Sequence, residues 1–150
     1  MLARKQVPFV RRSRLPEEPT PGRRVLLLDS LGELPHLYGR GRAIFVGGSL
    51  VPRGGHNILE PAAHGRPVIF GPHMENFREV AKGMIEGGGG FQVQDARELA
   101  DAMANLAQDE QLFRRAGEAA RAVVESNRGA LQRTLTHLDP YLSRFRPTSC

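Results

Sequence analysis

A glycine-rich stretch is the part of the sequence best suited to bind a ligand. It covers residues 47–61 and reads GGSLVPRGGHNILEP. It follows an apolar run at residues 43–46 and leads into a segment of helical character. Glycine lets a phosphate approach the backbone closely, and the free N–H groups at a helix start favour an anion. The stretch therefore predicts an anion-binding loop of the kind that follows strands in open α/β sheets.

Glu60 lies in the first turn of the helix predicted after this loop, and it has two interpretations. Its carboxylate can accept hydrogen bonds from a ribose diol. Asn57 stands three residues earlier, and Asn followed by Glu at that spacing is also a capping box, which needs no ligand. The spacing alone favours neither interpretation.

His56, Glu60 and His64 share one face of the same predicted helix, and His and Glu side chains can bind a metal ion. A capped helix start already explains two of the three residues. We therefore expect no metal here.

A second candidate loop covers residues 29–34 and reads DSLGEL. It also follows an apolar run and precedes a short helical stretch. Ser30 and the backbone at Leu31 and Gly32 can hydrogen-bond a base or a phosphate. The spacing of Ser30 and Glu33 is equally that of a capping box, which would be the better interpretation if this loop stood alone.

A third loop contains Gly71, Pro72 and His73. His73 can contact a sugar, although a histidine in this position is more often a turn or cap residue. Loops that follow parallel strands gather at one edge of the sheet, so we expect the three loops to lie together. No Ser/His/Asp arrangement or carboxylate pair is evident, so the sequence predicts a binding edge without a catalytic base.

Short apolar runs alternate with amphipathic segments along most of the chain, which is typical of a parallel sheet covered on both faces. The predicted strands are residues 25–29, 43–46, 68–70 and 91–93. The predicted helices are residues 34–38, 54–63, 76–85, 96–107 and 112–124, and a last helix carries Leu131, Leu135, Leu138 and Leu142 and breaks near Pro140. The predicted fold class is α/β, a Rossmann-like parallel sheet flanked by helices.

Two segments stand outside this pattern. Residues 1–24 mix prolines with charges, and only residues 7–10 have the character of a short strand, so we interpret this segment as the incomplete N-terminal edge of a domain formed by residues 25–150. The run Gly87-Gly88-Gly89-Gly90 is interpreted as a flexible turn between a helix and a strand.

The composition bounds the partners and the compartment. The 150 residues carry a formal net charge of +5 and give a sequence pI of about 10.3, which favours anionic partners such as nucleotides, nucleic acid or acidic lipid. The basic residues stand in scattered pairs, which are usually a solvated surface. The single cysteine, Cys150, has no partner for a disulfide, and no run approaches the roughly 18 apolar residues of a spanning helix, so a cytosolic setting is expected.

Taken together, the motifs resemble the Kdo transferase family, bacterial enzymes that move 3-deoxy-D-manno-octulosonic acid (Kdo) from CMP-Kdo onto a lipid A precursor. The resemblance covers the chain from about Arg12 onward and departs from the family at Ser30-Leu31, often Thr-Met, and at Ile58, often Pro. It rests on DSLGEL at 29–34, FVGGSLV at 45–51, Gly54-Gly55-His56-Asn57 with Glu60-Pro61, Gly71-Pro72-His73 with Asn76-Phe77, and Asn127 with Gly129-Ala130-Leu131.

The resemblance implies the C-terminal, donor-binding half of a GT-B glycosyltransferase, in which two Rossmann-like domains face each other across a cleft. It implies metal-independent transfer, and an acidic base, an acceptor surface and an association with the cytoplasmic face of the inner membrane that belong to the other half. This half alone is expected to bind CMP-Kdo without turnover and to bind no nucleic acid. The donor-binding positions that it implies are Leu31, Gly32, Glu33, Gly55, His56, Asn57, Ile58, Leu59 and Glu60.

Two alternatives stay open on the sequence. Glycine-rich loops followed by a helical Glu are common to GT-B transferases, so a UDP-sugar is the principal rival donor. The basic pI and the Met1 start also fit a separate nucleotide- or nucleic-acid-binding module, whose charge would form a stripe on one face.

Overall fold

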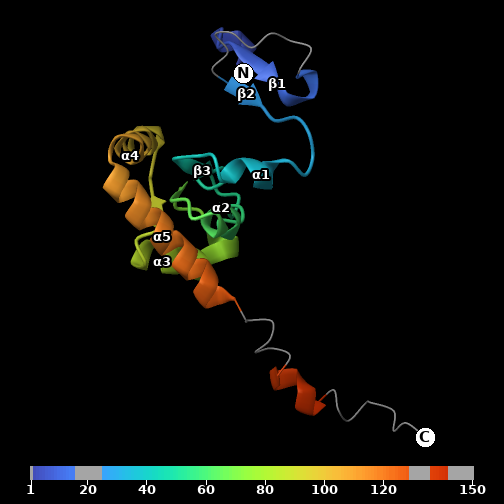
Figure 1. Cartoon of the computed structure of the whole chain (residues 1–150), viewed down its shortest axis with the longest axis vertical. Helices are drawn as coiled ribbons and strands as arrows, with labels where there is room; N and C mark the ends of the chain where they lie inside the picture. Colours follow the sequence, from blue (N-terminus) through green and yellow to red (C-terminus); the bar gives the residue numbers. More distant parts are fainter. Residues whose placement is uncertain (1, 16–24, 129–135, 142–150) are drawn as a thin grey trace, which may run out of the picture. The chain divides into compact units, whose positions relative to one another are not determined.

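The computed structural model describes residues 2–15, 25–128 and 136–141 (Figure 1). The chain forms two compact units, Met1–Arg40 and Gly41–Cys150. The sequence suggested a domain that begins at residue 25, after an incomplete edge formed by residues 1–24. That domain boundary stays a prediction.

The N-terminal unit is built around two parallel strands, β1 (Phe9–Arg11) and β2 (Val25–Leu27), with Phe9 opposite Val25. Short helices accompany them, namely η1 (Ala3–Lys5), η2 (Arg12–Arg14) and α1 (Leu34–Tyr38). The prediction of one sheet for all four strands was wrong in its pairing, because β2 hydrogen-bonds to β1 and the other three strands form their own sheet. A run of apolar residues in the sequence identifies a strand, but it does not show which other strand pairs with it.

The C-terminal unit contains a three-stranded parallel sheet of order β3-β4-β5. Its strands are β3 (Ile44–Val46), β4 (Val68–Phe70) and β5 (Gly90–Gln92). The helices are α2 (Leu59–Ala63), η3 (Glu75–Phe77), α3 (Arg78–Glu86), α4 (Ala96–Gln108) and α5 (Glu110–Asn127). The prediction of parallel strands alternating with helices is therefore confirmed for this unit.

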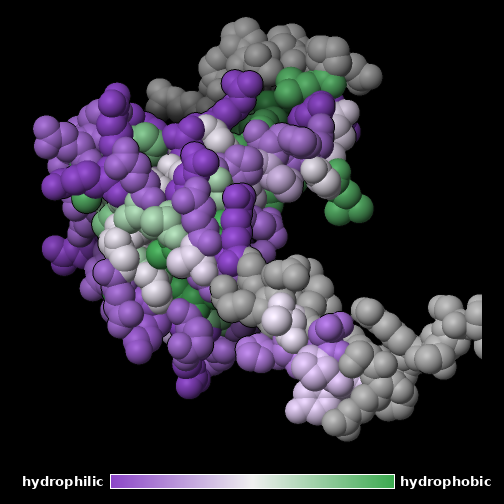
Figure 2. Space-filling view, turned by 60° about the horizontal axis from the view of Figure 1, so that its bottom comes forward, coloured by the Kyte–Doolittle hydropathy of each residue, from purple (hydrophilic) through white to green (hydrophobic). Residues whose placement is uncertain are grey.

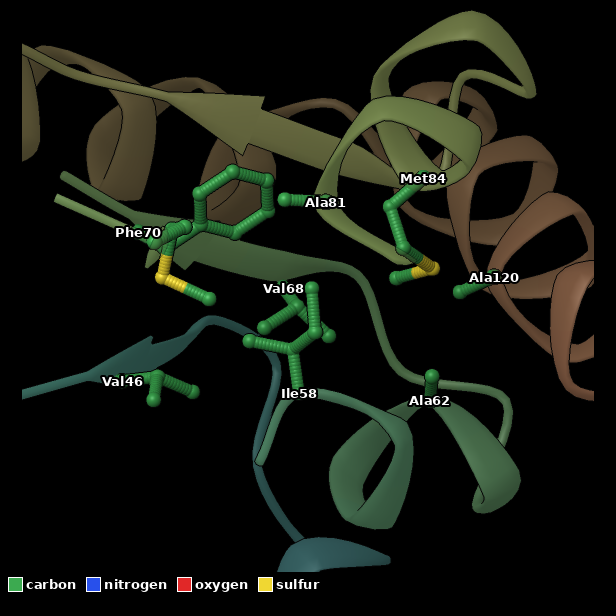
Figure 3. Close-up of a cluster of buried hydrophobic side chains, with 9 residues drawn as sticks. Val46, Ile58, Ala62, Val68, Phe70, Ala81, Met84 and Ala120 are labelled. Atoms are coloured by element: carbon green, nitrogen blue, oxygen red, sulfur yellow. The ribbon is translucent and has the colours of Figure 1, made fainter. Parts of the chain in front are cut away.

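The central strand β4 carries the core, because its three residues are all fully buried. Val68 and Phe70 pack with Ile58 before α2 and with apolar side chains of α2, α3 and α5 (Figure 3). Ile69, between them, belongs to a second cluster with residues of α4 and β5. Successive strand residues point to opposite faces, so β4 is covered by helices on both faces, as its continuous apolar run predicted.

The two long helices begin at aspartates that accept hydrogen bonds from exposed first-turn N–H groups. Asp95 accepts from Arg97 and Glu98 at 2.8 and 2.9 Å, and Asp109 accepts from Leu112 at 2.9 Å. Both helices were predicted from their apolar periodicity. Helix α4 begins at the predicted residue and ends one residue later, whereas α5 begins two residues earlier because the polar cap Asp109, rather than an apolar residue, sets its start, and it ends three residues later.

The run of four glycines is not a flexible turn. Gly88 has a φ of +78° and donates to Ile85 O, while Gly89 donates to Met84 O, which together form a Schellman cap on α3. A Cβ on Gly89 would lie 2.4 Å from the Ala120 nitrogen of α5. The glycines are therefore required by an ordered helix end and a close approach to α5.

The last predicted helix is described only in part. Residues 136–141, Pro140 included, are helical and exposed. The predicted break near Pro140 stays a prediction, because the described residues end at residue 141. Leu131, Leu135 and Leu142 lie outside the described residues, as do Gly129, Ala130 and Cys150.

Two helical glycines give a matched test of how closely the turn after α2, at Gly65, approaches α5. A Cβ on Gly117 in α5 would lie 2.3 Å from Gly65 O, whereas a Cβ on Gly83 in α3 would meet only Val123 at 3.8 Å. Gly83→Ala should raise the free energy of unfolding by about 0.5–1 kcal/mol. Gly117→Ala should lower it by about 1–3 kcal/mol, because the added methyl overpacks the contact. Urea denaturation of both variants measures the difference, and a stabilising Gly117→Ala would contradict the close approach.

Candidate functional site

Ile58 fixes the glycine-rich loop to the core. Its side chain is fully buried and points toward Val68 (Figure 3). The residues around it differ in exposure: Gly55 is buried, Asn57 and Leu59 are half-buried, and His56 and Glu60 are exposed. Ile58 was predicted as a ligand-contacting position, but its buried side chain leaves only its backbone for that purpose.

The helix after the loop starts later than predicted. It begins at Leu59 rather than near residues 54–57, so His56 is not on it, and His56, Glu60 and His64 do not share a helical face. Asn57 Oδ1 accepts the Leu59 N–H at 3.0 Å, which is an Asx turn ahead of the helix. With only five residues, α2 aligns few peptide dipoles, so its macrodipole contributes less to anion binding than a long helix would.

Glu60 keeps its place in the first turn of α2. Asn57 Nδ2 donates to Glu60 Oε1 at 3.1 Å, so the two residues are linked through their side chains rather than by a reciprocal capping box. Among the described residues, no side chain donates to Glu60 Oε2. The carboxylate is exposed and held in orientation, and it retains capacity to accept from a ligand.

The glycines of the loop are required by protein packing. A Cβ on Gly54 would lie 2.3 Å from Asn76 Nδ2, and one on Gly55 would lie 2.4 Å from Met74 Sδ. Both glycines have positive φ, +80° and +71°. The loop that follows β4 and η3 therefore fills the space where side chains of these two glycines would lie. That their backbone also admits a phosphate stays a prediction.

Ser49 joins these two loops inside the protein. Its hydroxyl donates to Val46 O at 2.5 Å and accepts the Gly71 N–H at 2.8 Å. Its carbonyl accepts the His73 N–H at 2.9 Å. Ser49 is fully buried and is the only buried polar side chain in the part of the chain that the structure describes. A lone hydroxyl between glycine and apolar residues was the sequence signal for this contact.

The second candidate loop lies in the N-terminal unit and has an open turn. Gly32 has a φ of +80° with no atom within 4 Å of an added Cβ, and Leu31 is 100% exposed. Glu33 Oε1 accepts from Arg12 Nη2 at 2.8 Å, and Oε2 accepts from the Ser30 hydroxyl. Glu33 is the N-cap position of α1, so Ser30 is not the cap that the spacing suggested.

The Arg12-Ser13 pair holds this loop, a role that sequence reasoning missed because the partners are 16 and 21 residues away. Ser13 donates to Asp29 through its N–H at 3.0 Å and its hydroxyl at 2.8 Å. The backbone hydrogen bond and then the hydroxyl of Ser13 lower the pKa of Asp29 from its ordinary 3.8. The hydrogen bond from Ser30, followed by Arg12, lowers the pKa of Glu33 from its ordinary 4.5.

The predicted positions therefore form two groups. Gly55 to Glu60 form one continuous edge beside the loop after β4, and Leu31 to Glu33 form an exposed turn in the other unit. That the two groups share one ligand stays a prediction. His73, which follows β4, lies 3.3 Å from Glu75 Oε1 through its Nδ1.

Where it is coloured, the face drawn in Figure 2 is mostly hydrophilic, with smaller hydrophobic areas between the hydrophilic residues. Among the described residues, no three His, Cys, Asp or Glu side chains lie close enough to hold a metal ion. No described helix has the length and apolar character needed to span a membrane.

The lowered pKa values predict an acid-sensitive N-terminal unit. A carboxylate whose pKa is lower in the folded state stabilises that state above its unfolded pKa, and the contribution is lost as the pH falls through the folded pKa. Carboxyl ¹³C titration should give midpoints below 3.8 for Asp29 and below 4.5 for Glu33. Ser30→Ala should raise the Glu33 midpoint and leave Asp29 unchanged. A Glu33 midpoint unaffected by Ser30→Ala would contradict the contact.

Several known proteins with similar sequences are Kdo transferases. The 3-deoxy-D-manno-octulosonic acid transferase of Haemophilus influenzae is 44% identical over 147 residues, which is 96% of this chain and 34% of that protein. That of Bordetella pertussis is 40% identical over 134 residues, 89% of this chain and 31% of that protein. The chain thus spans about a third of the length of these relatives. No protein-family model matches it.

A solved structure agrees with the sequence relatives. The C-terminal CMP-Kdo binding domain of WaaA from Acinetobacter baumannii aligns with a TM-score of 0.76 and 30% identity, covering 82% of this chain and 64% of that one. The predicted fold class, an α/β half of a GT-B fold, is therefore confirmed. The chain belongs to the 3-deoxy-D-manno-octulosonic acid transferase family and corresponds to its C-terminal part.

Proposed function

We propose that this chain binds the CMP-sugar donor in the transfer of Kdo from CMP-Kdo to a lipid A precursor, a step of lipopolysaccharide biosynthesis. The observation that carries the proposal is the ordered loop Gly48–Asn57 after β3, which packs against the loop after β4 and leads into α2, where the carboxylate of Glu60 is exposed. The 30% identity to a solved CMP-Kdo binding domain supports the choice of donor.

Each part of the site has a separate task in this proposal. The backbone N–H groups around His56 and Asn57 face the donor phosphate, and Glu60 accepts from the ribose hydroxyls. The exposed turn Leu31–Gly32 of the N-terminal unit is a donor-binding position that the family resemblance predicts. Glu33 has both carboxylate oxygens engaged by Ser30 and Arg12, so it shapes this turn rather than binding the donor directly. No metal is assigned to the reaction.

The reaction itself needs more than this chain provides. Transfer requires a base for the attacking sugar hydroxyl, and CMP departs with the bonding electrons of the broken bond. We place that base, the lipid acceptor surface and the attachment to the cytoplasmic face of the inner membrane in the part of the relatives that this chain does not cover. The backbone N–H groups beside Asn57 stabilise the charge that develops on the leaving phosphate, because their dipoles are already oriented.

Calorimetric titration of the chain with CMP and with UMP tests the proposal. A site built for a cytidine nucleotide should bind CMP more tightly than UMP by about tenfold, because the two bases present opposite hydrogen-bonding groups at N3 and at the substituent on C4. Equal affinities would favour a site that ignores the base, and tighter binding of UMP would favour a UDP-sugar transferase. Absence of CMP binding would contradict the proposal.

Glu60→Gln tests the ribose contact. Gln retains the size of the side chain and can still accept from Asn57, but it loses the charge-assisted acceptors. CMP affinity should fall by about 1.5–3 kcal/mol with little change in melting temperature. Glu79→Gln is the matched control, because it makes the same change in the first turn of α3. Unchanged CMP affinity with a lowered melting temperature would mean that Glu60 only stabilises its helix.

A further inference from the structure

Ser49 lies where the ladder between β3 and β4 ends. Val46 and Phe70 are the last paired residues of the two strands, after which the chains separate. The Ser49 hydroxyl lies between the last carbonyl of β3 and the first N–H after β4, donating to Val46 O and accepting from Gly71 N–H. It therefore extends the connection between the strands by one bridge beyond the backbone ladder.

The backbone of Ser49 makes a second connection to the same loop. Its carbonyl accepts the His73 N–H at 2.9 Å, and a Cβ on Gly71 would lie 2.2 Å from that carbonyl oxygen. The two chain segments are thus in contact on both sides of Gly71. A residue with a side chain at position 71 would separate them.

Further contacts continue from Ser49 along the glycine-rich loop. Gly55 N–H donates to Gly48 O at 3.2 Å, so the loop closes on the residue before Ser49. Asn76 N–H donates to Gly54 O at 3.2 Å, which joins the far end of the loop to the start of η3. The His56 ring lies over Gly48, where a Cβ would be 3.2 Å from it. The bond from Asn76 joins the two loops, whereas the two contacts of Gly48 lie within the glycine-rich loop.

We propose that Ser49 is a positioning residue for donor binding: its buried hydroxyl holds the loop Gly48–Asn57 in its binding conformation before the donor arrives. The inference rests on the proposed function. Ser49 touches no ligand, because its side chain is fully buried. Its hydroxyl acts through Gly71, His73 and the backbone of the glycine-rich loop. A site formed in advance binds its ligand more tightly, since no ordering of the loop accompanies binding.

Ser49→Ala leaves the buried Val46 carbonyl and the buried Gly71 N–H without their partner, and both must then find water or move. The loop should open more often than in the wild-type chain. Amide hydrogen exchange should accelerate by about tenfold or more at Gly71, and also at Gly55, His73 and Asn76, which do not bond to the hydroxyl. The dissociation constant for CMP should rise by about tenfold.

The control must lower stability without touching the loops. Leu106→Val removes one methylene from a fully buried side chain of α4, in the core cluster on the other face of β4. It should lower the melting temperature while leaving CMP affinity and the exchange of Gly55 and Asn76 unchanged. Where Ser49→Ala does not fold, Ser49→Cys is measured in the same way, since a thiol is close in size and a weak hydrogen-bonding group.

Two measurements decide between the outcomes. Faster exchange at Gly55 and Asn76 together with weaker CMP binding, beyond what Leu106→Val produces, supports a positioning role. Unchanged exchange at Gly55 and Asn76 would overturn it, whatever happens to stability, and so would a CMP affinity that falls no more than in the control. A wild-type chain that does not bind CMP would instead contradict the proposed function. The exchange rates at Gly55 and Asn76 would still test whether Ser49 holds the loop in place.

Discussion

The close approach of two loops that follow neighbouring strands is the constraint on which the candidate site depends. The loop after β3 and the loop after β4 pack so tightly that a Cβ on Gly54, Gly55 or Gly71 would lie 2.2–2.4 Å from the opposing loop. Side-chain atoms of Asn76 and Met74 lie against Gly54 and Gly55, and the backbone of Ser49 lies against Gly71. Ser49 also supplies the one buried hydroxyl among the described residues, which bridges the two loops. The exposed His56 and Glu60 are presented from a loop that is ordered because the protein itself occupies its inner side.

Burial, rather than surface charge, accounts for most of this order. Full burial of a side chain such as Ile58 contributes about 1.5–3 kcal/mol. The ion pair between Arg42 and Glu110, with side chains 43% and 51% exposed, contributes little, because solvent screens it. The same holds for the contacts of Glu33 with Arg12, which shape the exposed turn at Gly32 but are weakened by salt. The two candidate loops therefore differ in how firmly each is held.

The sequence predicted the elements well and their contacts poorly. The continuous apolar run of Val68 to Phe70 identified β4 because a central parallel strand is buried on both faces. The start of α2 was placed too early, because Asn57 caps an Asx turn rather than the helix, and local spacing does not separate the two. The packing role of Gly54 and Gly55 was not predicted, since a glycine needed for packing and one needed for a ligand look identical in a sequence. Ser49 and the Arg12-Ser13 pair were missed as contacts because their partners are distant along the chain.

The central claim is that the edge carrying Gly55 to Glu60 binds a cytidine nucleotide, and a chemical-shift map of the ¹⁵N-labelled chain titrated with CMP tests it most directly. The account predicts that the largest amide shifts fall at Gly55, His56, Asn57 and Glu60, and that they saturate together with one dissociation constant. Amides on α4 and on the far end of α5 should stay unchanged. Shifts confined to those helices, or spread evenly over basic residues without saturation, would contradict the account.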